Sequence, residues 1–424
     1  MTRPTLSLSR RAFLQTSAAV ALTAVPARAA SGPYRVGVAK DSDPYAATQR
    51  AIAWSGEFPS VLGRTVVVKP NLMMPATADT GATTDPNVTR AVVDEALARG
   101  AATVIVTETS PQGAHFAVTG HDAFATYDSR VQLVDVGTLP IVLAAVPGAL
   151  AYPAILAPDL YLRQDIVFIS VGKLKMHEQA YVSLSTKNLF GVPAVQRYVS
   201  FPSFGRFAMH DRGLQQAILD VNRLRSTHYA VIDGIWGMEG AGPAFGSPVR
   251  MNTVLAGRNT VAVDRVAMYL MNVPQYAVRY LTYASRFGLG PADLAAVYAV
   301  GDSVTPRTFA VPVVSPDIEY PRVIPAAIRP SAQQEATIAL WYGEQCTRRV
   351  EVARVYDDDP RSDHVRTIAE ARVVDQGYEW LAWDGRDDAG QIVAPGRYAI
   401  RVRADSVKGT VRNSGAVGWV TVNP

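Results

Sequence analysis

The sequence predicts an α/β fold, with a mostly parallel sheet covered by helices, followed by a small antiparallel β-sandwich domain. From Tyr34 to about Val314, short apolar runs rich in β-branched residues alternate with amphipathic helical stretches. A proline-rich stretch comes next, and after it short strand-like runs are separated by turn-forming residues. Strands that alternate with helices favour a parallel sheet with helices on both faces.

Four apolar runs are the expected strands of the first domain: Thr65–Val68, Thr103–Val106, Ile166–Ser170 and Ala230–Ile232. One helix is expected to begin at Asp85-Pro86 and to end before Gly100, because Asp is a good N-cap and Pro suits the first helical position. Another is expected from Gly213 to Arg225, where apolar residues recur at helical spacing on one face.

The end of the chain has a different character. Prolines recur through residues 315–330, which we interpret as an extended linker. Residues 331–424 contain five expected antiparallel strands: Ala336–Trp341, Arg349–Tyr356, Tyr378–Trp383, Arg397–Ala404 and Ala416–Val422. Short strands at this spacing favour a β-sandwich, so we expect an α/β domain over residues 30–314 and a sandwich over residues 331–424.

Residues 1–29 have the pattern of a removable export signal. Arg10 and Arg11 precede a short apolar stretch, and Ala27-Arg28-Ala29 is typical of a cleavage site. We therefore expect recognition by the twin-arginine translocase and a periplasmic or extracellular mature protein; the alternative is an uncleaved membrane anchor. After this signal, no uncharged run approaches the roughly 20 residues that span a bilayer.

Charge and cysteine content exclude several classes of protein. The formal net charge is +4, and the four arginines of the export signal account for all of it, so no nucleic-acid partner is expected. Cys346 is the single cysteine, which excludes an intrachain disulfide and a cysteine-ligated iron–sulfur cluster. The dinucleotide fingerprint G-x-G-x-x-G is absent, and the sequence names no cofactor.

Polar residues follow the expected strands at the edge where an open parallel sheet binds ligands. The candidates from the four strand ends are Lys69, Asn71, Glu108, Ser110, Lys173, Lys175, His177, Asp233 and Glu239. Lys173, Lys175 and His177 are spaced two apart, so in an extended segment their side chains share one face. Three basic groups on one face form an anion site. Further polar candidates along the chain are Lys187, Asn188, His210 and Asp264.

Several of these segments together resemble a known family. Val67-Val68-Lys69-Pro70-Asn71, Thr84-Asp85-Pro86, Lys173-Leu174-Lys175-Met176-His177, Lys187-Asn188-Leu189-Phe190-Gly191, Asp233-Gly234 to Gly242-Pro243 and Ala262-Val263-Asp264 occur in order. They resemble the family catalogued as domain of unknown function 362, over roughly residues 34–314. The resemblance implies an α/β core and no established common reaction. Some members carry ferredoxin-like cysteine motifs, which this chain lacks.

The C-terminal region resembles the immunoglobulin-like domain of the flagellar hook-capping protein. Trp383-Asp384-Gly385-Arg386-Asp387, Gly390 and Pro395-Gly396-Arg397-Tyr398 carry the resemblance. Such domains are attached to many exported bacterial proteins, where they act as binding or spacing modules. The resemblance therefore implies a possible envelope protein partner for this region, and it gives no flagellar role.

The preferred hypothesis is an enzyme or specific binder for a small anionic molecule, a carboxylate or a phosphate. Lys69, Lys173, Lys175 and Lys187 would hold the anion, with Asn71, Ser110 and Asn188 as further binding residues. His177 or His210 would be the general acid or base, because the pKa of histidine lies near working pH, and Glu108 and Asp233 would orient them.

Two alternatives remain open. One is a divalent-metal-dependent enzyme, whose ligands would come from His177, Asp233, Glu239 and Asp264, since imidazole with carboxylate suits zinc, manganese or iron. The other is a non-catalytic envelope protein, in which the α/β domain senses a ligand and the terminal domain binds a partner.

Overall fold

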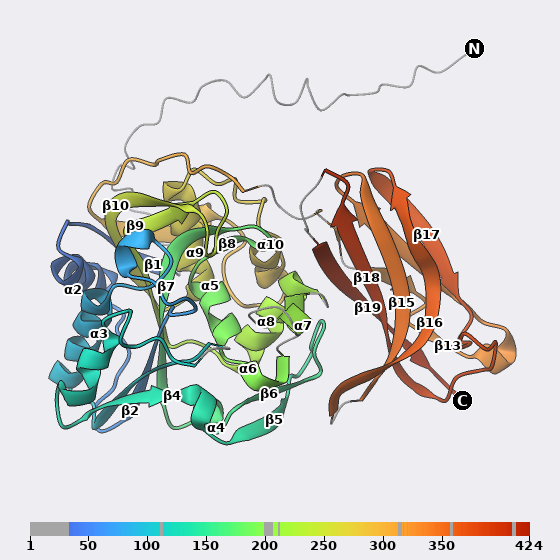
Figure 1. The fold of residues 1–424 in the computed structure, drawn as a ribbon, viewed down its shortest axis with the longest axis horizontal. Coiled ribbons are helices and arrows are strands. Elements are labelled where there is room, and N and C mark those ends of the chain that lie inside the picture. Colours follow the sequence, from blue (N-terminus) through green and yellow to red (C-terminus); the bar gives the residue numbers. More distant parts are fainter. Residues whose placement is uncertain are drawn as a thin grey trace, which may run out of the picture.

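The computed structural model describes residues 34–110, 113–198, 207–210, 213–312, 316, 318–319, 321–356, 359–408 and 413–424. The export signal expected at residues 1–29 lies outside these ranges. Figure 1 shows an α/β body and, beside it, a second body built from the strands of the C-terminal region. Among the described residues, no helix is long and apolar enough to cross a membrane.

The α/β body is organised around a nine-stranded sheet. Its main path runs in the order β11 (Val297–Gly301), β1 (Tyr34–Lys40), β10 (Ser247–Gly257), β9 (Tyr229–Glu239), β7 (Val167–His177), β2 (Thr65–Pro70), β3 (Thr103–Glu108) and β4 (Val131–Asp135). Strand β10 is antiparallel to both neighbours, and the other adjacent pairs along this path are parallel. The ninth strand, β8 (Tyr181–Ser183), turns back antiparallel onto β7. The predicted α/β class with a mostly parallel sheet is confirmed.

Helices cover both faces of the sheet, as the alternation of its apolar residues requires. Val66 and Val68 of β2 pack in one apolar cluster with α2 (Pro44–Ser55) and α3 (Pro86–Ala98). Val67, between them, packs in the opposite cluster with α8 (Leu214–Leu224), α9 (Thr260–Leu270) and α10 (Arg279–Arg286). A buried aliphatic side chain of this size stabilises the fold by about 1.5–3 kcal/mol, so both faces hold the sheet in place.

Helix boundaries follow the local signals closely. The Asp85 carboxylate accepts a hydrogen bond from the Asn87 amide at 2.7 Å and caps α3, which ends at Ala98. Strands β7 and β9 continue well past the apolar runs that predicted them, as far as His177 and Glu239. Polar residues that the sequence placed after two strands therefore lie within them.

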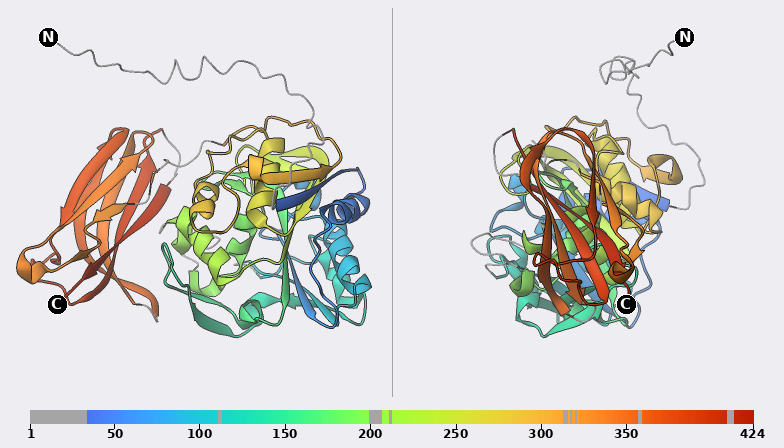
Figure 2. Two further views of the ribbon diagram at one scale, coloured as in Figure 1. Left: turned by 180° about the vertical axis from the view of Figure 1, so that it is seen from behind. Right: turned by 90° about the vertical axis from the view of Figure 1, so that its right-hand side faces the viewer.

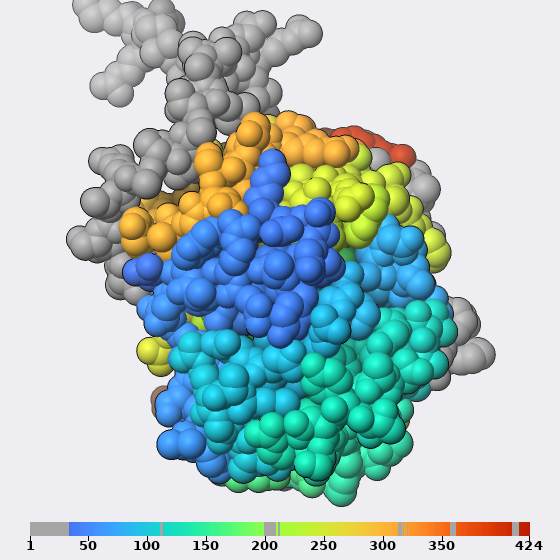
Figure 3. All heavy atoms as spheres, turned by 90° about the vertical axis from the view of Figure 1, so that its left-hand side faces the viewer, coloured from blue at the N-terminus to red at the C-terminus, as the bar shows by residue number. Residues whose placement is uncertain are grey.

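Shorter elements connect these parts. They are β5 (Ile141–Ala145) and β6 (Ala154–Pro158), which pair antiparallel, the helices α4 (Asp159–Leu162), α5 (Ser185–Asn188), α6 (Val195–Tyr198) and α7 (Phe207–His210), and the 3-10 turns η1 (Ala78–Thr80), η2 (His121–Thr126), η3 (Val136–Thr138), η4 (Leu189–Gly191) and η5 (Leu294–Ala296). Figure 3 shows the face on which the blue N-terminal elements lie beside the orange segment near residue 300, in keeping with the parallel pairing of β1 with β11.

The C-terminal body consists largely of antiparallel sheets. One sheet has the order β12 (Arg322–Ile324), β14 (Ala336–Tyr342) and β17 (Gly377–Trp383); the other has β13 (Ala327–Ile328), β19 (Asn413–Val422), β18 (Gly396–Ser406), β15 (Cys346–Tyr356) and β16 (Asp359–Val374). Pairing is antiparallel except between β13 and β19. A further 3-10 turn, η6 (Pro330–Ala332), precedes β14.

Two expectations for this region need correction. The stretch interpreted as a linker contributes β12 and β13, because backbone groups between its prolines pair with β14 and β19. The long strand β16 was not predicted from the sequence, because its many charged residues show no regular alternation, and the strand is defined by its pairing with β15.

The two bodies lie beside each other (Figure 2) and are joined by specific polar contacts. The Gln216 side chain of α8 accepts from the Val417 amide at 2.8 Å and donates to the Val417 carbonyl at 2.7 Å, as a neighbouring strand would. The Trp419 indole donates to the Leu150 carbonyl at 2.6 Å. Gly213 lies at the start of this contact, with a φ of 92°. A Cβ there would lie 2.8 Å from the Gln216 amide oxygen, so a larger residue would crowd the Gln216 side chain. Strand β19 therefore packs against α8.

Candidate functional site

The candidate site lies where β2 and β3 end and the neighbouring strands β7 and β9 continue past them. In the order β9, β7, β2 and β3, these strands bring Asp233, Lys173, Lys69 and Glu108 to one edge of the sheet. All four side chains are buried, and so are Lys175, His177, Lys187, Asn71 and Asn188. Burying this many ionisable groups is costly unless they are paired or serve a function, which makes the cluster the centre of the functional question.

Two of the lysines are held by carboxylates. Lys69 Nζ lies 2.5 Å from Glu108 Oε2, and Lys173 Nζ lies 2.8 Å from Asp233 Oδ2. The Asp233 carboxylate also accepts from the Asp85 and Ile235 amides, at 2.8 and 3.0 Å. Burial, followed by the nearby Asp233 charge, raises the pKa of Asp85. Lys69 and Lys173 are therefore cations fixed by buried ion pairs.

A pair of amides connects the lysines. Asn188 Nδ2 donates to the Lys69 carbonyl and to Ser170 Oγ, at 3.1 and 2.9 Å. Asn188 Oδ1 accepts from Asn71 Nδ2 at 3.1 Å and from Lys69 Nζ at 3.5 Å. Because these bonds use both donors and both acceptor positions of the amide, Asn188 orients Lys69 and Asn71 and has no capacity left for a ligand. Asn188, which we expected to bind the ligand, therefore has a positioning role.

Lys175 has a different environment. Its Nζ atom donates to Asn71 Oδ1 at 3.0 Å and to the Ala82 carbonyl at 2.7 Å, and both acceptors are neutral. Burial lowers the pKa of Lys175 well below its ordinary value, and the charges of Lys187, Lys173 and Lys69 lower it further, whereas Glu108 opposes them. An amine in this position resists protonation until negative charge arrives beside it.

Lys187 borders the cluster on the histidine side. Its Nζ atom lies 5.5 Å from the centre of the Phe190 ring, and the same ring meets His210 edge-on with centroids 5.0 Å apart. Gly191 follows, and a Cβ there would lie 2.5 Å from Lys69 Nζ, so this position must remain glycine for the lysine to keep its place. The Lys187–Gly191 segment therefore packs over Lys69, which is paired with Glu108, and contributes Lys187 to the cluster.

The two candidate histidines stack on each other, with ring centroids 6.1 Å apart and planes 14° apart. His177 Nδ1 accepts from the Gln179 and Ala180 amides, both at 3.1 Å, so the neutral ring carries its proton on Nε2. Burial lowers the pKa of His177 well below 6.5, and the Lys187 charge lowers it further. His177 is therefore suited to donate a hydrogen bond from Nε2. The base role that we considered for it fits poorly, since Nδ1 is occupied.

The alternative metal ligands have other partners. Asp264 accepts from the Ser185 and Thr186 amides at 2.8 and 3.0 Å, which caps α5, and burial raises its pKa to about 6. Glu239 accepts from the Ala310 amide at 2.8 Å. Within the described ranges, no group of three or more His, Cys, Asp or Glu side chains could hold a metal ion. The four proposed ligands, His177, Asp233, Glu239 and Asp264, thus do not form such a group.

Ser110 has a partner that the sequence reasoning missed. Its Oγ lies 2.8 Å from His115 Nε2 and 2.8 Å from the Gly113 carbonyl. Burial lowers the pKa of His115, which keeps this ring neutral near pH 7. The only signal in the sequence was a serine five residues before a histidine, directly after a strand. The sequence also did not predict the contact of Ala82, because side-chain patterns do not indicate which backbone carbonyl accepts a hydrogen bond from a lysine.

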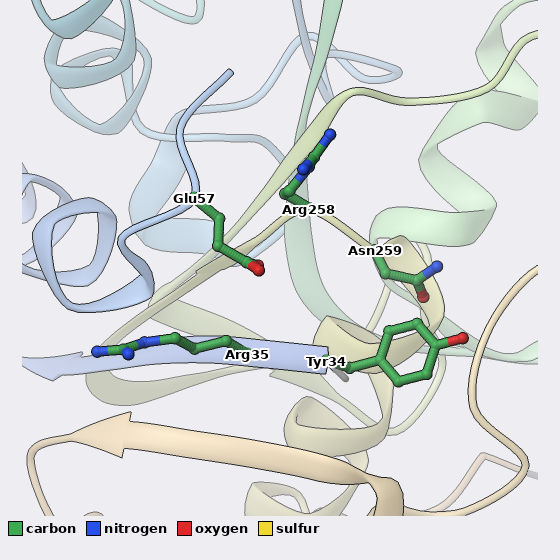
Figure 4. Close-up of a pocket in the computed structure, with 5 residues that line it drawn as sticks. All are labelled: Tyr34, Arg35, Glu57, Arg258 and Asn259. Carbon is green, nitrogen blue, oxygen red and sulfur yellow. The ribbon is translucent and has the colours of Figure 1, made fainter. Parts of the chain in front are cut away.

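A pocket of ≈ 280 Å³ lies elsewhere, lined by Tyr34, Arg35, Glu57, Arg258 and Asn259 (Figure 4). Tyr34 begins β1, and Arg258 follows the end of the antiparallel strand β10. Both therefore lie at the amino edge of the parallel strands, opposite the lysine cluster. The Asn259 side chain is occupied in capping α9, where it accepts from the Ala262 amide at 3.0 Å.

The fold and the site define an α/β body with a buried lysine–carboxylate cluster at the carboxyl edge of its sheet. Residues 66–269 match the model of the family described as "Domain of unknown function (DUF362)". This range contains β3, β7 and β9, all of β2 except Thr65, and every residue of the cluster. The match confirms the resemblance over this part of the chain.

A curated relative covers a smaller part. The chain is similar to "Thylakoid-associated protein sll1697" of Synechocystis sp. (strain ATCC 27184 / PCC 6803 / Kazusa), at 26% identity over 126 residues. This stretch covers 30% of the chain and 38% of that relative, well under two thirds of its length.

Solved structures give only weak similarities. Dimeric latent PorU from Porphyromonas gingivalis has 14% identity over 27% of this chain and 10% of its own, with a TM-score of 0.20. The β-glucosidase EmGH1 from Erythrobacter marinus has 11% identity over 92% of this chain and 49% of its own, with a TM-score of 0.18. At these scores neither similarity supports an inference about the fold or function.

Proposed function

We propose that the α/β body is an enzyme or specific binder for a small anionic molecule, a carboxylate or a phosphate, held at the carboxyl edge of the sheet. The observation that carries the proposal is the position of Lys175, a fully buried amine that contacts neutral oxygens and lies under the influence of three other lysines. An anion placed beside Lys175 would offset this local excess of positive charge.

Amino-acid usage supports a functional interpretation. The sequence contains 35 arginines and six lysines, namely Lys40, Lys69, Lys173, Lys175, Lys187 and Lys408. Four of these six are the buried lysines of the cluster. Arginine is the usual choice for a structural buried cation, because its planar group forms bidentate pairs. A chain that uses arginine almost everywhere but lysine here favours chemistry for which an amine is needed.

The surrounding residues have definable roles in this proposal. Lys69 and Lys173 supply fixed positive charge, with Glu108 and Asp233 keeping them in place. Asn71 aligns Lys175, and His177 offers its Nε2 proton as a hydrogen-bond donor. His210, which stacks on His177, remains the candidate acid or base of the pair, because a histidine can exchange a proton near neutral pH.

We also propose a cellular location for the protein and a role for its C-terminal body. Arg10 and Arg11 support export through the twin-arginine translocase, which would place the mature protein in the periplasm or outside the cell. We propose that the C-terminal sheets form an immunoglobulin-like sandwich that serves as a spacing or partner-binding module. In support, residues of both sheets, such as Ile338 and Val350, share one apolar cluster.

Binding of simple anions tests the proposal. Titration calorimetry with inorganic phosphate and with acetate would compare the native chain, Lys175→Met and the control Lys408→Met, whose exposed lysine pairs with Glu344. A charge-assisted hydrogen bond contributes about 1.5–3 kcal/mol, so Lys175→Met should weaken binding about ten- to a hundredfold. The control should bind as the native chain does. Equal binding by both variants, or no binding by the native chain, would contradict the proposal.

A further inference from the structure

The hydrogen-bond geometry of Lys175 matches a neutral amine. A protonated lysine has three N–H donors, whereas a neutral one has two donors and a lone pair. Lys175 Nζ makes two hydrogen bonds, to Asn71 Oδ1 at 3.0 Å and to the Ala82 carbonyl at 2.7 Å. Two donors and two acceptors are thus matched, and the nitrogen lone pair is left for a third, electron-poor partner.

The electrostatic surroundings act in the same direction. Complete burial and the charges of Lys187, Lys173 and Lys69 disfavour a proton on this nitrogen, and they lower the pKa of Lys175 accordingly. A buried lysine beside other cationic groups is one of the arrangements that activate an amine as a nucleophile. The arginines that the chain prefers elsewhere could not serve, since a guanidinium keeps its proton in proteins.

Resting on the anion site proposed above, we propose that Lys175 forms an imine with the carbonyl carbon of a small 2-oxo acid. The carboxylate of such a molecule supplies the negative charge that the cluster lacks around Lys175. Its adjacent carbonyl carbon is the electron-poor partner that a lone pair attacks. In this proposal Lys173 and Lys187, whose charges both act on Lys175, would hold the carboxylate.

The bonds balance without an oxidant or reductant. The Lys175 nitrogen forms a C–N bond to the carbonyl carbon while the carbonyl π bond opens onto oxygen. That oxygen takes one proton from the attacking amine and one from the neighbouring Lys187 ammonium, the C–O bond breaks, and water leaves. The product is a protonated imine that still carries the carboxylate, and its positive charge stands where an ammonium would otherwise be.

Burial limits the size of the partner. Lys175 is fully buried, and the cluster residues with the largest exposed fractions are Asn71 and Lys187, both at 8%. Because so little of the cluster is exposed, a compound that reaches the amine must be only a few atoms long. Glyoxylate, the smallest 2-oxo acid, is therefore the probe of choice.

Reductive trapping tests the imine directly. The native full-length chain is incubated with glyoxylate and cyanoborohydride near neutral pH, which converts an imine into a stable carboxymethyl-lysine. Because the chain has only six lysines, peptide mass spectrometry can compare the modification at each of them. Lys40 and Lys408 are exposed internal controls that lack the buried environment of Lys175 and should react slowly.

The expected result is modification of Lys175 at least tenfold faster than of Lys40 or Lys408, with protection of Lys175 by excess acetate. Lys175→Met should lose the fast reaction and leave that of the two controls unchanged, with its fold checked by circular dichroism. Modification of Lys40 and Lys408 with Lys175 unreacted would overturn the imine, as would equal rates at all three. If acetate still binds in calorimetry while trapping fails, the imine is refuted and the anion site stands; if acetate does not bind, the anion site fails as well.

Discussion

Two buried basic side chains, Lys175 of the α/β body and Arg348 of the C-terminal body, are held in opposite ways. Arg348 forms a two-pronged pair with Glu379, with Nε and Nη2 at 2.8 and 2.5 Å from its carboxylate oxygens, and Nη1 donates to the Glu370 carbonyl. Hydrogen bonding to Glu379 raises the pKa of Arg348. Lys175, in contrast, contacts neutral oxygens, and its pKa is lowered.

The difference separates a structural cation, Arg348, from a buried amine suited to ligand binding or catalysis, Lys175. Arg348 and Glu379 satisfy each other's hydrogen-bonding groups. The pair therefore orders the C-terminal body and has no capacity left for a ligand. Although burial alone opposes ionisation of Glu379, hydrogen bonds from Arg348 and Tyr342 hold its pKa below the usual value. Around Lys175 the charges do not balance, and balance is reached only when the amine stays neutral or an anion arrives. Variants at the two positions should therefore behave differently.

The largest effect on stability is expected at the structural pair. Arg348→Met removes the two-pronged partner of the largely buried Glu379 carboxylate, which then keeps only Tyr342 and Arg372, and breaking a buried pair costs about 3–5 kcal/mol. Urea denaturation of the native and variant chains measures this loss. The matched control is Arg349→Met, because the adjacent arginine is exposed and its pair with Glu351 should contribute about 1 kcal/mol or less. Equal losses in the two variants would contradict a structural role for Arg348.

A smaller loss is expected where the two bodies meet. Gln216→Ala leaves the Val417 amide and carbonyl without their partners, and an unsatisfied buried polar group costs about 1–3 kcal/mol. Thermal unfolding should show the loss, together with earlier unfolding of the C-terminal strands. Gln49→Ala, on the exposed surface of α2, is the control and should change stability little. An unchanged melting curve for Gln216→Ala would show that the two bodies do not stabilise each other.

The smallest effect on stability is expected at Lys175. Lys175→Met retains most of the apolar stem and removes a polar group from a like-charged cluster, so stability near neutral pH should stay about the same or rise. The dependence on pH should change. The pKa of Lys175 is lower in the folded chain than in the unfolded one, so between these values the unfolded chain binds more protons, and stability rises with pH.

This pH dependence can be measured by difference. Between the lowered pKa of Lys175 in the folded chain and its ordinary value in the unfolded chain, the native chain should gain up to about 1.4 kcal/mol of stability per pH unit relative to Lys175→Met. Denaturant titrations of both chains at several pH values give this slope. Parallel curves would mean that Lys175 titrates normally when folded, and that the contrast with Arg348 is not one of charge state.

The contrast could be anticipated from the sequence only in part. Lys173, Lys175 and His177 were expected on one face of an extended segment, and they alternate with Leu174 and Met176, which pack in the apolar cluster. Capping of α3 by Asp85 was predictable because its signal lies within four residues. The edge that would carry Lys69, Glu108 and Asp233 could be inferred from the parallel order of strands, since the ends of such strands lie together.

Other features depend on contacts that no local pattern encodes. Nothing in the sequence separates the paired lysines, Lys69 and Lys173, from Lys175, because the pairing depends on which strands are neighbours. The saturation of Asn188, the occupied Nδ1 of His177 and the receiving carbonyl of Ala82 likewise depend on the folded backbone. Arg348 gave no signal, since its partner Glu379 lies 31 residues away on another strand.

Nuclear magnetic resonance of the lysine side chains tests the central claim most directly. Full-length chain labelled with ¹³C at lysine gives six Cε signals, few enough to follow individually, and Lys175→Met identifies the one of interest. The account predicts that this signal titrates far below the ordinary pKa of lysine, and that saturating acetate or phosphate raises its pKa. A Lys175 signal that titrates near the ordinary lysine value of about 10.4, and does not respond to either anion, would contradict it.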